Sequence, residues 1–333
     1  MRFPRFLSEG DRIGVTAPSC GVTEPTDINR FDHAKAVLGS MGHPVVETSN
    51  VYTADEMGRS SPADQKVREL FSLLQDPTVG AVIAAKGGDY QCEMLLHMDW
   101  DLLERYPKWM QGYSDNTVLL FKITAEHDIA TIYGGNFGDF GMEPWHRSIT
   151  ESLEFLEGKR TEQISFPFHE VGFSDRVTGL EPMRDDEPTV WRSSCGNVSF
   201  SGRLIGGCMD VLEWYHRKAT ASPKRFNDLY SEDGTVWYME TYDMDEKRIT
   251  RMLDGMTEDG WFDGVRGFVF GRPLFFSGDD YMGMVTDALS GFDVPMLFDA
   301  DVGHKAPRMT FINGALATFD FKNGACKLSY EFR

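Results

Sequence analysis

An apolar strand runs directly into an amphipathic helix in the stretch Trp109-Met110-Gln111-Gly112-Tyr113-Ser114-Asp115-Asn116-Thr117-Val118-Leu119-Leu120. A serine on such a strand-to-helix turn is lifted clear of the sheet, and the helix N-terminus offers free N–H groups to an oxyanion. Gly112 has no Cβ, which avoids crowding where the turn is tight. The stretch therefore predicts an exposed serine nucleophile, while the simpler alternative is that Ser114 or Asp115 only caps the helix.

The same strand-then-helix pattern recurs from Asp11 to about Tyr133. Short apolar runs predict strands, and apolar residues at helical spacing predict helices between them. The expected strands cover residues 12–17, 43–48, 81–85, 108–113 and 130–133. Repeated β-α-β units predict a doubly wound parallel sheet, which places functional loops at the carboxyl ends of the strands.

Regular periodicity fades into sequence rich in proline, glycine and charge after residue 160. We therefore expect an N-terminal domain at 1–160, a linker at 161–197 and a C-terminal domain at 198–333. The strands expected in the last part cover residues 235–241, 266–270, 295–298, 317–321 and 325–330, with a helix at 245–257. Lys322-Asn323-Gly324 predicts a hairpin between the last two strands. A smaller mixed or barrel-like domain fits this pattern.

The composition excludes several classes of partner. The 333 residues carry 52 Asp and Glu against 33 Lys and Arg, a net charge of −19 that repels nucleic acid polymers and anionic lipid. Five widely spaced cysteines without a CxxC pair argue against a disulfide framework and a structural zinc site. The N-terminus lacks the apolar core of a signal peptide, and no apolar stretch is long enough for a membrane span. We therefore expect a cytoplasmic protein.

A second strand end carries paired glycines, in Ala84-Ala85-Lys86-Gly87-Gly88-Asp89-Tyr90. The glycines allow close backbone approach, so the Gly88 N–H could donate to an oxyanion or a phosphate. The GxGxxG pattern of a dinucleotide site is absent. Taken alone, the segment is also compatible with an ordinary βα turn.

A nucleophilic serine needs a base that a third group orients. His304 follows an apolar strand on a loop, beside Gly303, and is better placed to act than histidines on helix faces. A metal site made by Asp299, Asp301 and His304 is an alternative. Glu240 lies in an aromatic-rich strand, where a carboxylate is costly unless paired; the alternative is an outward-facing residue.

Taken together and in order, these motifs resemble the LD-carboxypeptidase and microcin C immunity (MccF-like) serine peptidases. The resemblance spans nearly the whole chain and rests on Val15-Thr16-Ala17-Pro18-Ser19, Lys86-Gly87-Gly88-Asp89, Gly112-Tyr113-Ser114-Asp115-Asn116-Thr117, Gly202-Arg203-Leu204-Ile205-Gly206-Gly207, Met239-Glu240 and Gly303-His304. It implies an α/β fold with a Rossmann- or flavodoxin-like parallel-sheet domain first and a swivelling β-barrel-like α+β domain second. The active site would lie in the cleft between them, and closure of that cleft would gate the reaction.

The resemblance also implies roles for single residues. Ser114 would be the nucleophile, His304 the general base and then acid, and Glu240 the group that orients the imidazole. The backbone N–H groups of Gly88 and Asp115 would form the oxyanion hole. Candidates for contact with the substrate are Lys86, Gly87, Thr117 and Trp191. No metal or cofactor is expected, and relatives suggest a homodimer.

Two substrates fit this family. One branch resembles enzymes that remove the terminal D-alanine from a murein tetrapeptide; the other resembles immunity enzymes that cleave aminoacyl or peptidyl nucleotides. Gly88-Asp89, rather than the Gly-Tyr common among recycling enzymes, favours the second branch. A rival from another class is a non-catalytic protein that binds a peptide or nucleotide in the same cleft.

Overall fold

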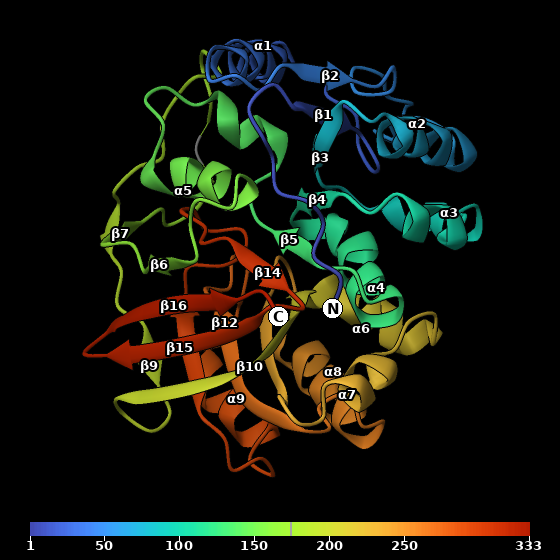
Figure 1. Ribbon diagram of the computed structural model, residues 1–333. Coiled ribbons are helices and arrows are strands. Elements are labelled where there is room, and N and C mark those ends of the chain that lie inside the picture. Colours follow the sequence, from blue (N-terminus) through green and yellow to red (C-terminus); the bar gives the residue numbers. More distant parts are fainter. Residues whose placement is uncertain (174) are drawn as a thin grey trace.

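Six strands form the first sheet, in the order β14-β5-β4-β3-β1-β2. The computed structural model describes residues 1–173 and 175–333, and Figure 1 shows this sheet in the upper half of the molecule. The strands are β1 (Arg12–Thr16), β2 (Val45–Glu47), β3 (Val79–Ala84), β4 (Trp109–Gly112), β5 (Thr131–Tyr133) and β14 (Phe311–Asn313). Strands β1 to β5 pair in parallel, as their apolar runs predict, and β14 is antiparallel to β5.

A helix follows each of the strands β1 to β5 and completes the α/β fold. These helices are α1 (Pro25–Ser40), α2 (Ala63–Gln75), α3 (Trp100–Arg105), α4 (Thr117–His127) and α5 (Arg147–Leu156). Helix α4 is apolar nearly all round because it packs between two cores. Leu119 and Leu120 join the core of the first sheet, whereas Val118 and Phe121 join that of the second.

The second sheet is mixed, in the order β6-β16-β15-β10-β11-β12-β13-β9. Its strands are β6 (Glu162–Ile164), β9 (Arg192–Ser193), β10 (Val198–Cys208), β11 (Thr235–Glu240), β12 (Val265–Gly271), β13 (Met296–Ala300), β15 (Leu316–Lys322) and β16 (Ala325–Glu331). Strands β10 to β13 are parallel, and the others pair antiparallel. The predicted hairpin joins β15 to β16, with Asn323 and Gly324 both at positive φ.

Four helices accompany the second sheet: α6 (Met209–Lys218), α7 (Lys224–Leu229), α8 (Glu246–Glu258) and α9 (Tyr281–Ala288). Together with α4 they cover a core rich in methionine and aromatic side chains. Of the four, the sequence pattern predicts only α8. The apolar residues Ile249, Met252, Leu253 and Met256 of α8 are all buried.

Several described residues of the expected linker at 161–197 form strands. Its strands β6 and β9 form the two ends of the second sheet, and β7 (Phe168–His169) pairs with β8 (Glu187–Pro188). The side chain of Gln163 is buried and donates to the Thr310 carbonyl at 2.6 Å. Very short strands leave little periodicity in the sequence, which is why this segment resembles a linker.

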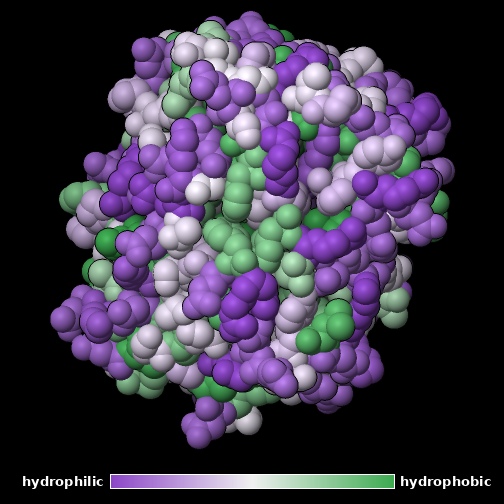
Figure 2. Space-filling view, viewed as in Figure 1, coloured by the Kyte–Doolittle hydropathy of each residue, from purple (hydrophilic) through white to green (hydrophobic). Residues whose placement is uncertain are grey.

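Hydrophilic side chains cover most of the face seen in Figure 2, and apolar ones gather in a small central area. This surface agrees with the large excess of acidic residues. Among the described helices, none combines the length and the apolar character that crossing a bilayer requires.

Candidate active site

Ser114 lies at the turn between β4 and α4, where a short 3₁₀ helix (Ser114–Asn116) begins. Its φ is 66°, a left-handed conformation that a non-glycine residue adopts at a cost. Two glycines make room for this turn. A Cβ at Gly112 would lie 2.9 Å from the Asn116 side chain, and one at Gly87 would lie 3.1 Å from Ser114 Oγ.

His304 and Glu240 reach Ser114 from the second sheet. Glu240 ends β11 and is fully buried, while His304 lies on the loop after β13. The distance from His304 Nε2 to Ser114 Oγ is 3.0 Å, and that from His304 Nδ1 to Glu240 Oε2 is 2.8 Å. Gly303, at φ 106°, permits the approach, because a Cβ there would lie 2.5 Å from Glu240 Oε2. The three side chains form one hydrogen-bonded chain.

Tyr133 completes this arrangement, although it was not among the site residues predicted from the sequence. Its hydroxyl donates to Glu240 Oε1 at 2.5 Å and accepts the Ser114 N–H at 3.1 Å. Burial, with the Glu240 charge nearby, raises the pKa of Tyr133 well above its usual value, so the hydroxyl keeps its proton. Its position at the carboxyl end of a predicted strand is the signal that could have identified it.

Glu240 stays ionised in this buried position. Burial alone would raise its pKa, but electrostatic attraction to His304 and hydrogen bonds from His304 and Tyr133 outweigh burial and lower the pKa. An ionised carboxylate beside Nδ1 holds the imidazole with its proton on that nitrogen. Nε2 is then free to accept a proton from Ser114.

Gly88 and Asp115 lie on neighbouring strand ends beside Ser114. Gly88 has a φ of 144°, and a Cβ there would lie 2.5 Å from Ser19 Oγ, so only glycine fits. Both residues line a cavity of about 520 Å³ together with Ser114 and His304. Both residues therefore border the space beside Ser114.

Polar and aromatic residues line the rest of this cavity. Lys86 and Gly87 line it, and the Lys86 Nζ pairs with Asp27 at 3.3 Å. The other residues that line it are Cys20, Asp89, Cys92, Tyr113, Val118, Asn136, Phe173, Cys208, Asp210, Val211, Trp214 and Tyr242. Tyr242 lies against the imidazole of His304, with ring centres 4.9 Å apart.

The structure does not bring the other two proposed substrate contacts to the cavity. Trp191 is 1% exposed, and its Nε1–H donates to Asp301 at 3.1 Å, so it belongs to the core. Thr117 is fully buried and accepts the Cys208 N–H at 3.0 Å. Thr117 thereby joins α4 to β10. Neither side chain can contact a substrate while it makes these contacts.

The acidic residues near His304 form ion pairs with arginines. Asp299 pairs with Arg192, and Asp301 pairs with the buried Arg272 at 2.7 Å. The alternative of a metal held by Asp299, Asp301 and His304 therefore has no geometric support.

Arg308 fixes the loop that carries His304. Its Nε donates to the Gly303 carbonyl at 2.6 Å, and its guanidinium lies over the Tyr113 ring, 4.1 Å from the ring centre. A second nitrogen donates to the hydroxyl of Tyr113 at 3.2 Å. The Tyr113 ring meets the imidazole edge to face. Arg308 thus holds His304 from its backbone side.

Comparison with known proteins gives the family. Residues 13–134 match the LD-carboxypeptidase N-terminal domain, and residues 201–319 match the LD-carboxypeptidase C-terminal domain. Together the two matches cover well over half of the chain. They also fall on the two halves of the molecule that contribute Ser114 and the Glu240–His304 pair.

Two curated relatives match nearly end to end. A putative carboxypeptidase of Vibrio cholerae is 26% identical over 98% of both chains. The microcin C7 self-immunity protein MccF of Escherichia coli is 25% identical over 98% of this chain and 95% of its own.

Solved structures agree on the fold. A mutant of the microcin C7 self-immunity protein in complex with adenosine monophosphate superposes with a TM-score of 0.81, at 21% identity, over 99% and 98% of the two chains. Another structure of that protein holds aspartyl sulfamoyl adenosine. The muramoyltetrapeptide carboxypeptidase of Oxalobacter formigenes gives a TM-score of 0.72, at 20% identity, over 96% and 99%. With both family domains matched in order, the chain belongs to the LD-carboxypeptidase family of serine-type peptidases.

Proposed function

We propose that the protein hydrolyses a small amide-like substrate through an acyl-enzyme on Ser114, with His304 and Glu240 completing a triad. The observation that carries this proposal is the hydrogen-bonded chain from Ser114 Oγ through His304 to the buried Glu240, beside a cavity. Its distances lie within the range expected for a nucleophile, its base and the group that orients the base.

In the first half of the reaction, Ser114 Oγ attacks the substrate carbonyl carbon while His304 Nε2 takes the hydroxyl proton. The negative charge on the carbonyl oxygen is stabilised by the N–H groups of Gly88 and Asp115. His304 then gives its proton to the leaving nitrogen, the C–N bond breaks, and the acyl group stays on Ser114.

In the second half, water attacks the acyl carbon and gives a proton to His304 Nε2. The tetrahedral intermediate collapses, Ser114 Oγ leaves and recovers a proton from His304, and the free acid departs. Glu240 stays ionised throughout and stabilises the imidazolium that forms twice in the cycle.

A fluorophosphonate probe tests the nucleophile. We expect covalent labelling of the wild-type protein at Ser114 and no labelling of Ser114→Ala. Ser201→Ala is the matched control, because Ser201 lies on β10 outside the cavity and should not affect labelling. A folded wild-type protein that is neither labelled nor active on either substrate class would instead favour the non-catalytic binding protein.

Aromatic side chains at the cavity favour an aminoacyl nucleotide over a murein tetrapeptide. Phe173 and Tyr242 line the cavity beside His304, and Phe275 packs edge to face on Tyr242. Phe173 and Phe275 are 58% and 52% exposed, so flat apolar surface is open to a ligand. Stacking of a base on an aromatic side chain contributes about 1–3 kcal/mol, a gain that the aliphatic and charged tetrapeptide lacks.

Parallel turnover of an aminoacyl sulfamoyl nucleoside and a murein tetrapeptide tests this preference. We expect a higher kcat/KM for the nucleoside, and Phe173→Ala should raise its KM about tenfold, the effect of losing one stacked ring. Phe168→Ala, a substitution of an exposed phenylalanine outside the cavity, should change neither constant. Faster turnover of the tetrapeptide, insensitive to Phe173→Ala, would make the protein an LD-carboxypeptidase of murein peptides.

A further inference from the structure

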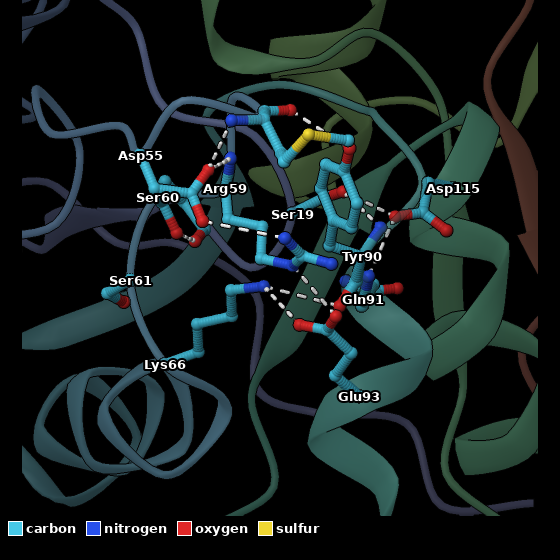
Figure 3. A network of polar contacts seen from close by, with 12 residues as sticks. Ser19, Asp55, Arg59, Ser60, Ser61, Lys66, Tyr90, Gln91, Glu93 and Asp115 are labelled. Carbon is cyan, nitrogen blue, oxygen red and sulfur yellow. Dashed lines mark hydrogen bonds and ion pairs between the residues drawn. The ribbon is translucent and has the colours of Figure 1, made fainter.

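The side chain of Asp115 makes contacts that its proposed backbone role does not require. It is 6% exposed, and its Oδ2 accepts the Ser19 hydroxyl at 2.5 Å and the Gln91 N–H at 2.9 Å. Figure 3 shows the carboxylate pointing toward Ser19, Tyr90 and Gln91. A buried carboxylate that accepts hydrogen bonds from another segment holds that segment in place.

The segment it fixes contains Gly88. Ser19 Oγ, which donates to Asp115, accepts the Tyr90 N–H at 3.0 Å. On the other side of Gly88, the Gly87 carbonyl accepts the Cys20 N–H at 3.2 Å. The segment on both sides of Gly88 is therefore tied to the Cys20 backbone and to the Ser19 side chain, and through Ser19 to Asp115. Both N–H groups proposed for the oxyanion hole then belong to one hydrogen-bonded unit.

A second group of charges supports this segment from outside. The Arg59 guanidinium lies 4.2 Å from the centre of the Tyr90 ring and donates to Glu93 at 2.9 Å. The fully buried Lys66 donates to the Tyr90 carbonyl at 3.3 Å and pairs with Glu93 at 3.4 Å. In Figure 3, Arg59 and Lys66 converge on Glu93 and the Tyr90 backbone. These contacts leave Tyr90 little freedom to move away from Asp115.

We propose that the Asp115 carboxylate is a positioning residue that sets the distance between the Gly88 and Asp115 N–H groups, and so the fit of the oxyanion hole to the transition state. The inference rests on the proposed function, because it presumes an oxyanion next to Ser114. It goes further in giving the Asp115 side chain, Ser19 and the 87–91 segment a common role. An oxyanion hole acts on the transition state, so a loosened one lowers kcat and leaves substrate binding intact.

The test compares Asp115→Asn, Asp115→Ala and Ser19→Ala with the wild-type protein. Removing a single oxyanion donor costs about 10²–10³ in kcat. We expect about a hundredfold loss for Asp115→Ala and about tenfold for Asp115→Asn, which keeps an uncharged acceptor that bonds more weakly. KM should stay within about threefold in each. Asp115→Ala combined with Ser19→Ala should cost less than the product of the single effects, because both break one clamp.

A boronic acid that forms a tetrahedral adduct with Ser114 gives a readout that a merely structural role would not move. Its affinity should fall in parallel with kcat/KM across the variants, whereas the affinity for the product acid should not change. Asp245→Asn is the matched control, because Asp245 also accepts a backbone N–H, at the start of α8, but lies outside the cavity. This control should retain wild-type kcat and boronate affinity.

Two outcomes separate the inference from the function on which it rests. Turnover by Ser114→Ala would overturn the proposed function itself. If Ser114→Ala is inactive while folded Asp115→Asn and Ser19→Ala keep wild-type kcat and boronate affinity, only the positioning role is overturned. Ser19→Ala removes a single oxygen atom, so this variant can test the positioning role if Asp115→Ala does not fold. A rise in KM without a fall in kcat would also contradict the inference.

Discussion

Replacing Glu240 with glutamine is the sharpest test of the proposed triad. Two donors meet the carboxylate, His304 Nδ1–H on one oxygen and the Tyr133 hydroxyl on the other. Glutamine offers one oxygen and one NH₂ group, so one of the two donors would face another donor. The variant also removes the charge 2.8 Å from the imidazole, which stabilises the imidazolium in the transition state.

The size of the loss follows from these two effects. Neutralising the carboxylate of a comparable triad lowers kcat about 10⁴-fold by favouring the wrong imidazole tautomer. In the Glu240→Gln variant, the Tyr133 hydroxyl competes with His304 Nδ1–H for the single glutamine oxygen. We therefore expect kcat to fall by at least about 10³-fold, or about 4 kcal/mol of transition-state stabilisation. KM should change little, because Glu240 is fully buried behind His304 and does not line the cavity.

Single-turnover kinetics on the preferred substrate measures this loss, and thermal unfolding shows whether the variant folds. Glu213→Gln is the control. Glu213 is 6% exposed and pairs with Arg248 at 2.7 Å, so it is also a buried, paired glutamate, but it lies outside the cavity. A folded Glu240→Gln variant with kcat within about tenfold of the wild type would refute the assignment of Glu240.

Three further predictions follow from single contacts. Gly88→Ala should lose most activity and destabilise the fold, because its Cβ would lie 2.5 Å from Ser19 Oγ at a φ of 144°; wild-type activity in this variant would contradict the tight packing. Trp191→Phe should lower the free energy of unfolding by about 1–3 kcal/mol, since Asp301 loses a buried donor, and should leave KM unchanged; a raised KM would return Trp191 to the substrate contacts. Burial raises the pKa of Asp115 to about 6 even though hydrogen bonds from Ser19 and the Gln91 N–H lower it. As the pH rises, the Asp115 carboxyl therefore ionises first in the unfolded chain. The free energy of unfolding of the wild type relative to Asp115→Asn should fall by about 3 kcal/mol in all between about pH 3 and pH 7, as measured by urea unfolding.

The parallel strands of the first sheet were predictable because each one leaves a short apolar run. Strand β10, the longest of the second sheet, was not, since Gly202, Gly206 and Gly207 interrupt its pattern. Those glycines are what let β10 approach its neighbours. A Cβ at Gly207 would collide with the side chain of Thr117, and one at Gly206 would collide with the Tyr238 carbonyl. The glycines that interrupt the apolar pattern of β10 thus also allow this strand to pack against α4.

Ser114, Glu240 and His304 could be selected as candidates, because each lies at or after a strand end. Tyr133 also ends a strand, but its role and that of Arg308 depend on pairings across the two sheets. Tyr133 reaches Glu240 over 107 positions of sequence, and Arg308 reaches Tyr113 over 195. Local patterns carry no information on such distances, so motifs identify reacting groups better than the residues that hold them.

The way the two sheets are joined bears on whether closure of the cleft gates the reaction. Strand β14 comes from the C-terminal part of the chain yet pairs with β5 in the first sheet. Helix α4, which follows Ser114, places Val118 and Phe121 in the core of the second sheet. Burial of one such side chain is worth about 1.5–3 kcal/mol, so a wide separation of the sheets would cost several kcal/mol in α4 alone. In this arrangement Ser114 Oγ and His304 Nε2 lie 3.0 Å apart. We therefore expect a preassembled triad, in which locking the two sheets together leaves kcat unchanged.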